Sequence, residues 1–277
     1  MSDWQRLWPA PAKLNLFLHV VGRRPDGYHL LQTVFRFVDY ADELRFSPRP
    51  DRRVVLATPV AGVDPESDLT VRAARALAQA KGCDRGVTIE LTKRIPMGGG
   101  LGGGSSDAAT TLLALNRLWG CGLDLSDLQT IGLTLGADVP VFIHGRNCFA
   151  EGIGERFYDV RLPPAWYLLV VPPVQVPTLA VFTDPGLRRD TPRLDAACWQ
   201  PGSGGNDLEP VTCRLFPAVR ETLDLLGRYG RARMSGSGAC CFVEFADEQQ
   251  ARAVLAVLPA GVCGFVARGL DAHPIQN

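Results

Sequence analysis

Apolar residues in the first half of the chain follow both strand-like and helix-like periods. Runs that alternate or stay continuously apolar, as strands require, occupy residues 14–21, 33–38, 53–57 and 87–91. Between the last two runs, apolar residues recur at helical spacing from Asp68 to Lys81. Ser67 or Asp68 can cap that helix, and Gly82 is expected to end it. The first half is therefore predicted to be mixed α/β without strict alternation of strands and helices.

A glycine cluster at residues 98–104 precedes a second predicted helix. Ser105 or Ser106 is expected to cap this helix and Gly120 to stop it. A shorter helix is expected between Asp124 and about residue 135. These elements complete the first of two predicted lobes, residues 1–160.

Prolines between residues 163 and 177 bracket a predicted strand at 167–171 and place a lobe boundary near residue 160. The remaining elements are expected to be a helix at 215–226, a strand at 239–245, a helix at 248–258 and a last strand at 262–267. Strands and helices that alternate around a second small glycine turn are typical of a compact α+β lobe. That lobe is predicted to span residues 161–277.

Composition narrows the classes of protein to consider. The 29 basic and 29 acidic residues cancel, so no polybasic arm for nucleic acid is expected. A hydrophobic content of 46% argues against intrinsic disorder. No uninterrupted apolar run approaches the length of a membrane span, and the N-terminal segment lacks the pattern of an export signal. The sequence thus predicts a cytoplasmic protein without nucleic-acid or membrane partners, and it does not decide between a monomer and a homodimer.

The eight cysteines are scattered and contain no C-x-x-C pair, which favours reduced thiols over a disulfide framework. The four histidines are equally dispersed, and none has a neighbouring cysteine at metal-ligand spacing. A structural zinc site is therefore not expected.

Residues 96–108 place six glycines directly before the N-terminus of a predicted helix. Glycine lets the backbone approach a bulky anion closely, and the helix start adds unpaired N–H groups and the positive end of its dipole. Such a loop is suited to phosphate, although a flexible glycine-rich turn is the plain alternative.

Two known phosphate loops can be compared by spacing. A P-loop is excluded because no Gly-Lys pair occurs. The dinucleotide pattern G-x-G-x-x-G is formally matched by Gly98, Gly100 and Gly103, with Asp124 about twenty residues further on. Six residues separate the strand from Gly98, whereas that pattern turns directly off its strand. An NAD(P)-dependent oxidoreductase therefore stays as the alternative.

Three segments together resemble one enzyme family. Residues 11–16 (PAKLNL), 96–109 and 234–240 resemble, in order, the three motifs of the kinases grouped with galactokinase, homoserine kinase, mevalonate kinase and phosphomevalonate kinase. The resemblance implies a two-lobed α/β (α+β) small-molecule kinase fold, with an N-terminal lobe like ribosomal protein S5 and a ferredoxin-like C-terminal lobe. It also implies ATP as phosphoryl donor, Mg²⁺, and an alcohol as acceptor.

Further segments at residues 24–29, 136–142 and 206–210 resemble one branch of that family. This branch phosphorylates the 2-hydroxyl of 4-diphosphocytidyl-2-C-methyl-D-erythritol in the non-mevalonate isoprenoid pathway. The resemblance covers all but the first eight residues and the tail past 268. Another small-molecule kinase of the same family and a nucleotide-binding regulator without activity remain as alternatives.

The resemblance also assigns roles to individual residues. Asp138 is the candidate for guiding or deprotonating the attacking hydroxyl, with Lys13 beside it as the cation that stabilises its charge. Residues implied for the acceptor substrate are Asn15, Tyr28, His29, Thr178 and Phe182, the aromatic rings holding the cytosine. Residues implied for ATP are Lys93, Pro96, Met97, Gly98, Gly99, Gly100, Leu101, Gly102, Gly103, Gly104, Ser105, Ser106, Gly236, Ser237 and Gly238.

Two features depart from the family pattern. No Mg²⁺ ligand is assigned, because neither Asp107 nor Glu151 stands out from other carboxylates. Leu179 occupies a position where related chains often carry proline, which can shift the loop expected to carry Phe182.

Overall fold

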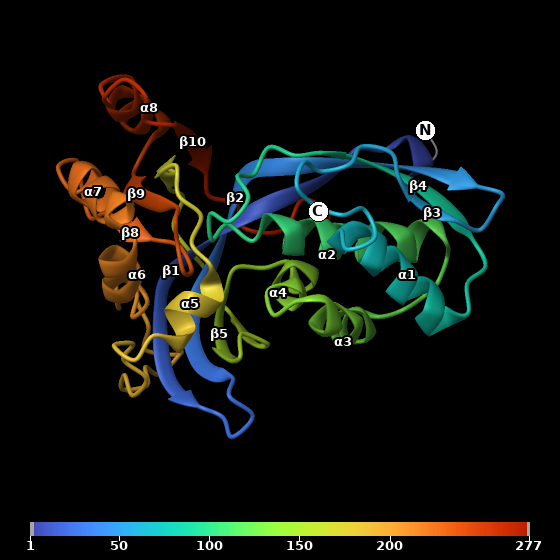
Figure 1. The fold of residues 1–277 in the computed structure, drawn as a ribbon, viewed down its shortest axis with the longest axis horizontal. Helices are drawn as coiled ribbons and strands as arrows, with labels where there is room; N and C mark the ends of the chain where they lie inside the picture. The colour runs from blue at the N-terminus through green and yellow to red at the C-terminus, as the bar shows by residue number, and fades with distance from the viewer. Residues whose placement is uncertain (1–2, 276–277) are drawn as a thin grey trace.

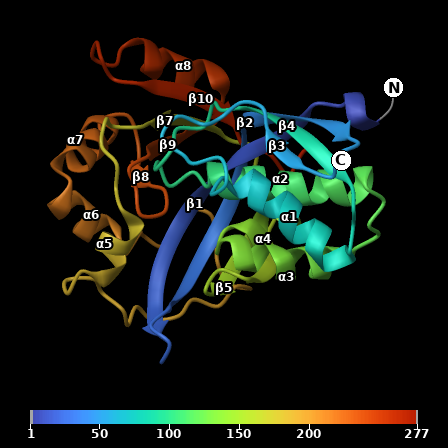
Figure 2. The same cartoon turned by 45° about the vertical axis from the view of Figure 1, so that its right-hand side comes forward.

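The computed structural model describes residues 3–275 and contains two sheets with helices packed on them (Figure 1). The larger sheet has the strand order β3-β4-β2-β5-β6, with β1 paired to β2. Its strands are β1 (Trp8–Arg23), β2 (His29–Arg49), β3 (Val54–Leu56), β4 (Gly86–Thr92), β5 (Cys148–Gly152) and β6 (Arg156–Asp159). The helices α1 (Leu69–Lys81), α2 (Gly103–Leu118), α3 (Leu125–Leu135) and α4 (Val139–His144) gather on one side of this sheet (Figure 2).

The smaller sheet has the order β10-β7-β9-β8. Its strands are β7 (Trp166–Val170), β8 (Arg233–Met234), β9 (Cys241–Phe245) and β10 (Gly264–Arg268). The helices of this part are α5 (Thr178–Thr183), α6 (Glu209–Leu215), α7 (Pro217–Leu226) and α8 (Glu248–Ala256). Strand β1 joins the two parts, because the Val20 amide donates to Asp207 Oδ2 at 2.7 Å and the Leu18 amide donates to the Gly205 carbonyl at 2.8 Å.

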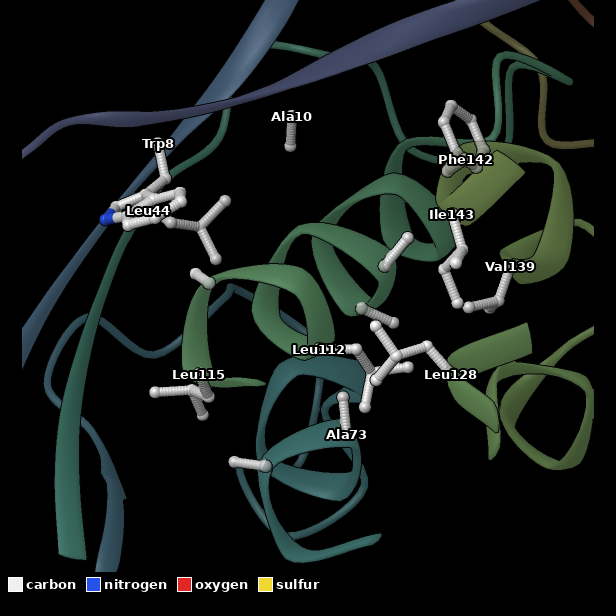
Figure 3. Close-up of a cluster of buried hydrophobic side chains, with 14 of the residues drawn as sticks. Trp8, Ala10, Leu44, Ala73, Leu112, Leu115, Leu128, Val139, Phe142 and Ile143 are labelled. Carbon is white, nitrogen blue, oxygen red and sulfur yellow. The ribbon is translucent and has the colours of Figure 1, made fainter. Parts of the chain in front are cut away.

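The core of the larger part lies between its sheet and α2 (Figure 3). Trp8 and Leu44 from the sheet, Leu112 and Leu115 from α2, and Phe142 from α4 are all buried there. Strand β1 is buried almost throughout residues 8–20, which explains why apolar residues occupy both of its faces instead of alternating with exposed polar ones. None of the helices within residues 3–275 combines the length and apolar character that crossing a bilayer requires.

Several helix boundaries agree with the sequence. Asp68 caps α1 through a bond from the Thr70 amide, and Gly82 ends it in the left-handed conformation. Asp124 caps α3 in the same way. The prediction that Ser105 or Ser106 caps α2 was wrong, because the helix begins at Gly103 with Gly102 as its N-cap and no side-chain cap. The glycine loop thus runs directly into the helix and leaves its first amides free.

Other elements differ from their predicted form. The helix expected at 215–226 corresponds to α7, which begins two residues later at Pro217, because Phe216 is extended as a residue before proline tends to be. Strand β2 is far longer than the predicted run at 33–38, since its outer half, which pairs with β4, alternates buried and exposed residues and lacks a continuous apolar run. The short elements β5, β6, β8, α4, α5 and α6 were not predicted.

The C-terminal segment returns to the larger part. Bridges pair Val38 with Gly269 and Arg146 with Ala272, and His273 is fully buried beyond them. The Ile275 amide donates to His273 Nδ1 at 3.2 Å, so the ring proton lies on Nε2, 3.5 Å from Thr110 Oγ1. Burial lowers the pKa of His273 to about 3.

This histidine should make the protein acid-sensitive. Below pH about 6.5 the His273 imidazole binds a proton in the unfolded chain but not in the folded protein. The free energy of unfolding therefore falls as pH decreases, by about 1.4 kcal/mol per pH unit. Denaturation at pH 7 and pH 5 should show the wild type losing about 2 kcal/mol more than His273→Gln, which keeps donor and acceptor without titrating. Equal losses in both proteins would contradict this account.

Candidate active site

A cavity of about 750 Å³ opens where β1, β2, the glycine loop, the start of α4 and helix α5 meet. All residues predicted for catalysis or for the acceptor substrate line it, namely Lys13, Asn15, Tyr28, His29, Asp138, Thr178 and Phe182. Five of the residues predicted for ATP also line it, namely Gly100, Gly102, Ser105, Gly236 and Ser237. Residues from distant parts of the sequence therefore share one hollow.

Lys13 lies inside strand β1 with only 3% of its surface exposed. Its ammonium donates to Asn15 Oδ1 at 2.6 Å and to the Gly100 carbonyl at 3.0 Å, and it lies 3.4 Å from Asp138 Oδ2. A buried cation is tolerated only when such partners replace its water. The lysine is therefore fixed between the glycine loop and a carboxylate.

Asp138 follows the end of α3 and occupies the N-cap position of α4. Its carboxylate makes no capping bond and its side chain is 39% exposed, so one face contacts Lys13 and the other meets the cavity. Pro140 in the first turn of α4 restrains the backbone that carries this aspartate. The arrangement holds a charged carboxylate ready for a ligand.

Asn15 is oriented by both ends of its amide. Its Oδ1 accepts from Lys13, while its Nδ2 donates to Thr33 Oγ1 at 2.9 Å on the neighbouring strand. Its backbone amide donates to Ser235 Oγ at 3.2 Å. Asn15 therefore links the lysine to the third motif.

The glycine loop and the third motif are joined by hydrogen bonds to the backbone carbonyls of the loop. The Cys240 amide donates to the Gly99 carbonyl at 3.1 Å, and Ser235 Oγ donates to the Gly100 carbonyl at 2.9 Å. A Cβ on Gly100 would lie 2.2 Å from the Ser235 carbonyl oxygen, and its φ of +70° favours glycine as well. The close approach therefore requires glycine at position 100.

Gly100→Ala should displace the two loops and lower kcat/KM for ATP about a hundredfold, the scale expected for a shift of about 1 Å in a site. Gly122→Ala is the matched control, since Gly122 has a φ of +66° but open space around its Cβ. The control should show only the strain of a left-handed alanine, about 1–2 kcal/mol of stability. Equal kinetics and melting temperatures in the two variants would refute the steric argument.

The other ten residues predicted for ATP do not line the cavity, and three of them, Ser106, Leu101 and Lys93, have other partners in the protein. Ser106 is buried and its hydroxyl donates to the Pro11 carbonyl at 2.7 Å, so this hydroxyl bonds to the backbone of β1 instead of facing the cavity. Leu101 is buried and its carbonyl accepts from the Lys13 amide at 3.0 Å. Lys93 does not line the cavity.

Lys93 instead lies between two buried carboxylates. Its ammonium contacts Asp42 and lies 2.7 Å from Asp107 Oδ2. Burial alone would lower the pKa of Lys93, but Asp107 and Asp42 outweigh it and the net direction is upward. Burial also raises the pKa of Asp107, although Lys93 opposes that rise. This lysine is held inside the protein just beneath the start of α2.

Two aromatic rings, His29 and Phe182, line the same cavity. The centroids of His29 and Phe182 are 5.1 Å apart with the planes tilted by 38°. Phe182 belongs to helix α5, so the expectation of a loop at this position was wrong. Thr178, from the same helix, shares a hydrogen bond of 2.9 Å with Ser237. Tyr28 is 59% exposed at the mouth.

Sequence reasoning missed some residues of this site. Arg23 and Asp26 also line the cavity, and the segment 24–29, which contains Asp26 and follows Arg23, was a usable signal. Ser235, which contacts both Asn15 and Gly100, lies within the third motif. Arg189 bonds to His29, and nothing in its local sequence marks it.

Comparisons with known proteins agree with this architecture. Residues 68–146 match the family described as "GHMP kinases N terminal domain", and residues 191–262 match "GHMP kinases C terminal". The chain therefore belongs to the GHMP kinases, the family of galactokinase, homoserine kinase, mevalonate kinase and phosphomevalonate kinase, and it is an ATP-dependent kinase. The alternative of an NAD(P)-dependent oxidoreductase is not supported.

Individual relatives cover almost the whole chain. A protein of Dechloromonas aromatica (strain RCB) named 4-diphosphocytidyl-2-C-methyl-D-erythritol kinase is 62% identical over 98% of this chain and 99% of its own. A protein of Thiobacillus denitrificans with the same name is 57% identical over 98% and 97%. A crystal structure of 4-(cytidine 5'-diphospho)-2C-methyl-D-erythritol kinase superimposes with a TM-score of 0.83 at 36% identity, covering 95% of this chain and 99% of its own.

Proposed function

We propose that this kinase transfers the γ-phosphoryl group of ATP to the 2-hydroxyl of 4-diphosphocytidyl-2-C-methyl-D-erythritol. The observation that carries the proposal is the Lys13–Asp138 contact of 3.4 Å, next to the glycine loop and in the same cavity as the His29–Phe182 pair. Relatives over 50% identical along nearly their full length carry the name of this activity.

Phosphoryl transfer needs alignment and dispersal of negative charge. The acceptor hydroxyl lies against Asp138, which orients it and takes its proton as the oxygen attacks the γ-phosphorus. The new O–P bond forms while the bond to the β-phosphate oxygen breaks, and ADP leaves with that electron pair. Lys13 stabilises both the aspartate charge and the negative charge growing on the transferred group.

The glycine loop and the start of α2 hold the triphosphate. Free amides at the first turn of α2 and the positive end of its dipole bind anions. Ser105 adds a hydroxyl at the cavity wall, whereas the Ser106 hydroxyl supports the fold. The remaining ATP contacts of Lys93 and of the glycine loop stay predictions.

The cytidine end binds at the opposite side of the cavity. Tyr28 and Phe182 offer ring faces to the base, and His29 offers a polar edge. Asn15 is bonded to Lys13, where the methylerythritol end belongs, and Thr178 is a further contact for the substrate in the same cavity. Residues 1–160 then form the ATP-binding lobe and residues 161–277 the lobe that completes the site, in a cytoplasmic enzyme.

Mg²⁺ is the metal that triphosphate chemistry implies. No group of three His, Cys, Asp or Glu residues within residues 3–275 could form a protein cage for it. This fits an ion that arrives with ATP, because Mg²⁺ usually keeps its waters and binds phosphates with one or two protein ligands. Glu151 accepts from Gln32 at 2.6 Å, Asp107 pairs with Lys93 at 2.7 Å, and neither lines the cavity, whereas the Ser105 hydroxyl lines it and can serve as a ligand. When bound, the ion neutralises charge on the phosphates.

The test is an assay of ADP release coupled to a spectrophotometric readout. The cytidine diphosphate substrate should support turnover, whereas galactose, homoserine and mevalonate at equal concentration should not. Phosphorylation of one of those acceptors instead would reassign the substrate within the family. If none of the four acceptors supports ADP release, the proposal is refuted.

A further inference from the structure

Arg189 lies behind the cavity, between the start of β2 and the end of α5. Its Nε donates to His29 Nε2 at 3.1 Å. Its Nη2 donates to the carbonyls of Phe182 and Asp184 at 2.9 and 2.8 Å, and its Nη1 donates to the Leu187 carbonyl at 2.9 Å. One guanidinium group therefore fixes both the His29 ring and the end of α5, the helix that carries Phe182.

The charge of Arg189 has no carboxylate partner in the described part of the chain. The nearby Asp184 carboxylate pairs with Arg214 at 2.6 Å, and only its backbone carbonyl accepts from Arg189. Because guanidinium donates and never accepts, all of its acceptors here must present lone pairs. The group is held rigidly by neutral acceptors and keeps its positive charge.

This geometry sets the protonation of His29. Its Nε2 accepts from Arg189, so the neutral ring carries its proton on Nδ1. Burial lowers the pKa of His29, and the charges of Arg189 and Arg23 lower it further, while Asp26 is the acidic group that shares the cavity wall. The Nδ1–H group has no partner within residues 3–275, and it is free to donate to a ligand.

We propose that Arg189 is a positioning residue that locks His29 as the neutral Nδ1–H tautomer and thereby selects cytosine over uracil. Cytosine presents an acceptor at N3, which a ring N–H donor can satisfy. Uracil carries a proton at N3, so the two donors would oppose each other and leave a polar group unpaired. This inference rests on the proposed function, since it concerns the base of that substrate.

The same guanidinium also places Phe182. Helix α5 has only six residues, and the last carbonyls of a helix have no intrahelical partner, so they need an external donor. Arg189 supplies that donor to Phe182 and Asp184, which keeps the phenyl ring 5.1 Å from His29. Loss of Arg189 should therefore weaken base recognition in two ways, without touching the Lys13–Asp138 pair.

The first experiment reads the tautomer without substrate. Nitrogen-15 spectra of histidine-labelled full-length protein, with His29 assigned from His29→Gln, should show the Nδ1–H tautomer in the wild type. Arg189→Met should give mixed tautomers and a higher pKa for His29. Arg188→Met is the matched control, because Arg188 is 61% exposed and contacts Asp190. An unchanged His29 spectrum in Arg189→Met would overturn the proposal.

The second experiment reads the consequence in kinetics. Arg189→Met should raise KM for the cytidine substrate about tenfold or more while kcat and KM for ATP stay within about threefold, and it should lower the preference over the uridine analogue. The acid limb of its kcat/KM profile should move to higher pH. Arg189→Lys keeps the positive charge but loses the forked geometry of the guanidinium group. Its KM for the cytidine substrate should lie between those of the wild type and Arg189→Met, and it replaces the methionine variant if that variant does not fold.

If Arg189→Met lowers kcat and raises the KM values for ATP and for the cytidine substrate together, or if Arg188→Met shows the same changes, the role of Arg189 is merely structural and the inference is overturned. A wild-type protein that shows the Nδ1–H tautomer but does not phosphorylate the cytidine substrate would instead refute the proposed function. The two failures are therefore distinguishable.

Discussion

Asp138→Asn is expected to lower kcat by about two to four orders of magnitude, the range that a positioned proton acceptor contributes. Asparagine keeps the size of the side chain but neither carries charge nor accepts a proton. Since the side chain is 39% exposed and makes no capping bond, the fold should tolerate the change. KM for ATP should change little, because the glycine loop is not altered.

Asp124→Asn is a suitable control for this experiment. Asp124 caps α3 through a bond from the Asp127 amide, and asparagine is an equally good cap. Both variants remove one carboxylate oxygen from a cap position, but only one of them lies beside Lys13. A kcat for Asp138→Asn within a factor of about three of the control would refute the catalytic role.

Pre-steady-state measurements refine the same prediction. If Asp138 removes the proton, the remaining rate of Asp138→Asn should rise with pH as the hydroxyl ionises by itself. If it only orients the hydroxyl, the variant should keep the pH profile of the wild type at a lower rate. The distance of 3.4 Å from Lys13 is compatible with either role, so the profile decides.

The strongest sequence signals predicted the elements that position the site. Strand β1 and helix α1 agree with the sequence because burial imposes a pattern on every residue of such elements. Helix α5 was missed since it has only six residues and its stability comes from Arg189 and from packing. Short elements of this kind carry too few residues for a period to appear.

Some residues of the candidate site could likewise be predicted from the sequence, and others could not. Lys13, Asp138 and the glycine loop were found because they lie in dense motifs, although composition alone would have made Lys13 a surface charge and the structure buries it. The position of Lys93 was not predictable, because its two partners are 51 and 14 residues away in sequence. Long-range ion pairs leave no local pattern, so only the folded chain reveals them.

That buried cluster leads to the largest expected effect on stability. Lys93→Met should lower the free energy of unfolding by about 3–5 kcal/mol, the cost of leaving buried charges without their partner. Asp42 is 0% exposed and Asp107 is 3% exposed, so water cannot replace the ammonium. The melting temperature should fall by about 10 °C, and Lys81→Met, which removes an exposed lysine at the end of α1, should change stability by less than about 0.5 kcal/mol.

The pH dependence separates lost charge compensation from lost packing. Without Lys93, the carboxyl of Asp107, whose pKa burial already raises, can regain stability only by binding a proton, so the deficit of Lys93→Met should shrink as pH falls from 8 to 5. The double variant Lys93→Met, Asp107→Asn should recover part of the loss at pH 8, because Asp42 keeps the Arg94 and Ile95 amides as donors at 2.5 and 2.8 Å. A deficit that is constant with pH and insensitive to Asp107→Asn would mean that the aliphatic stem, not the charge, supports the start of α2.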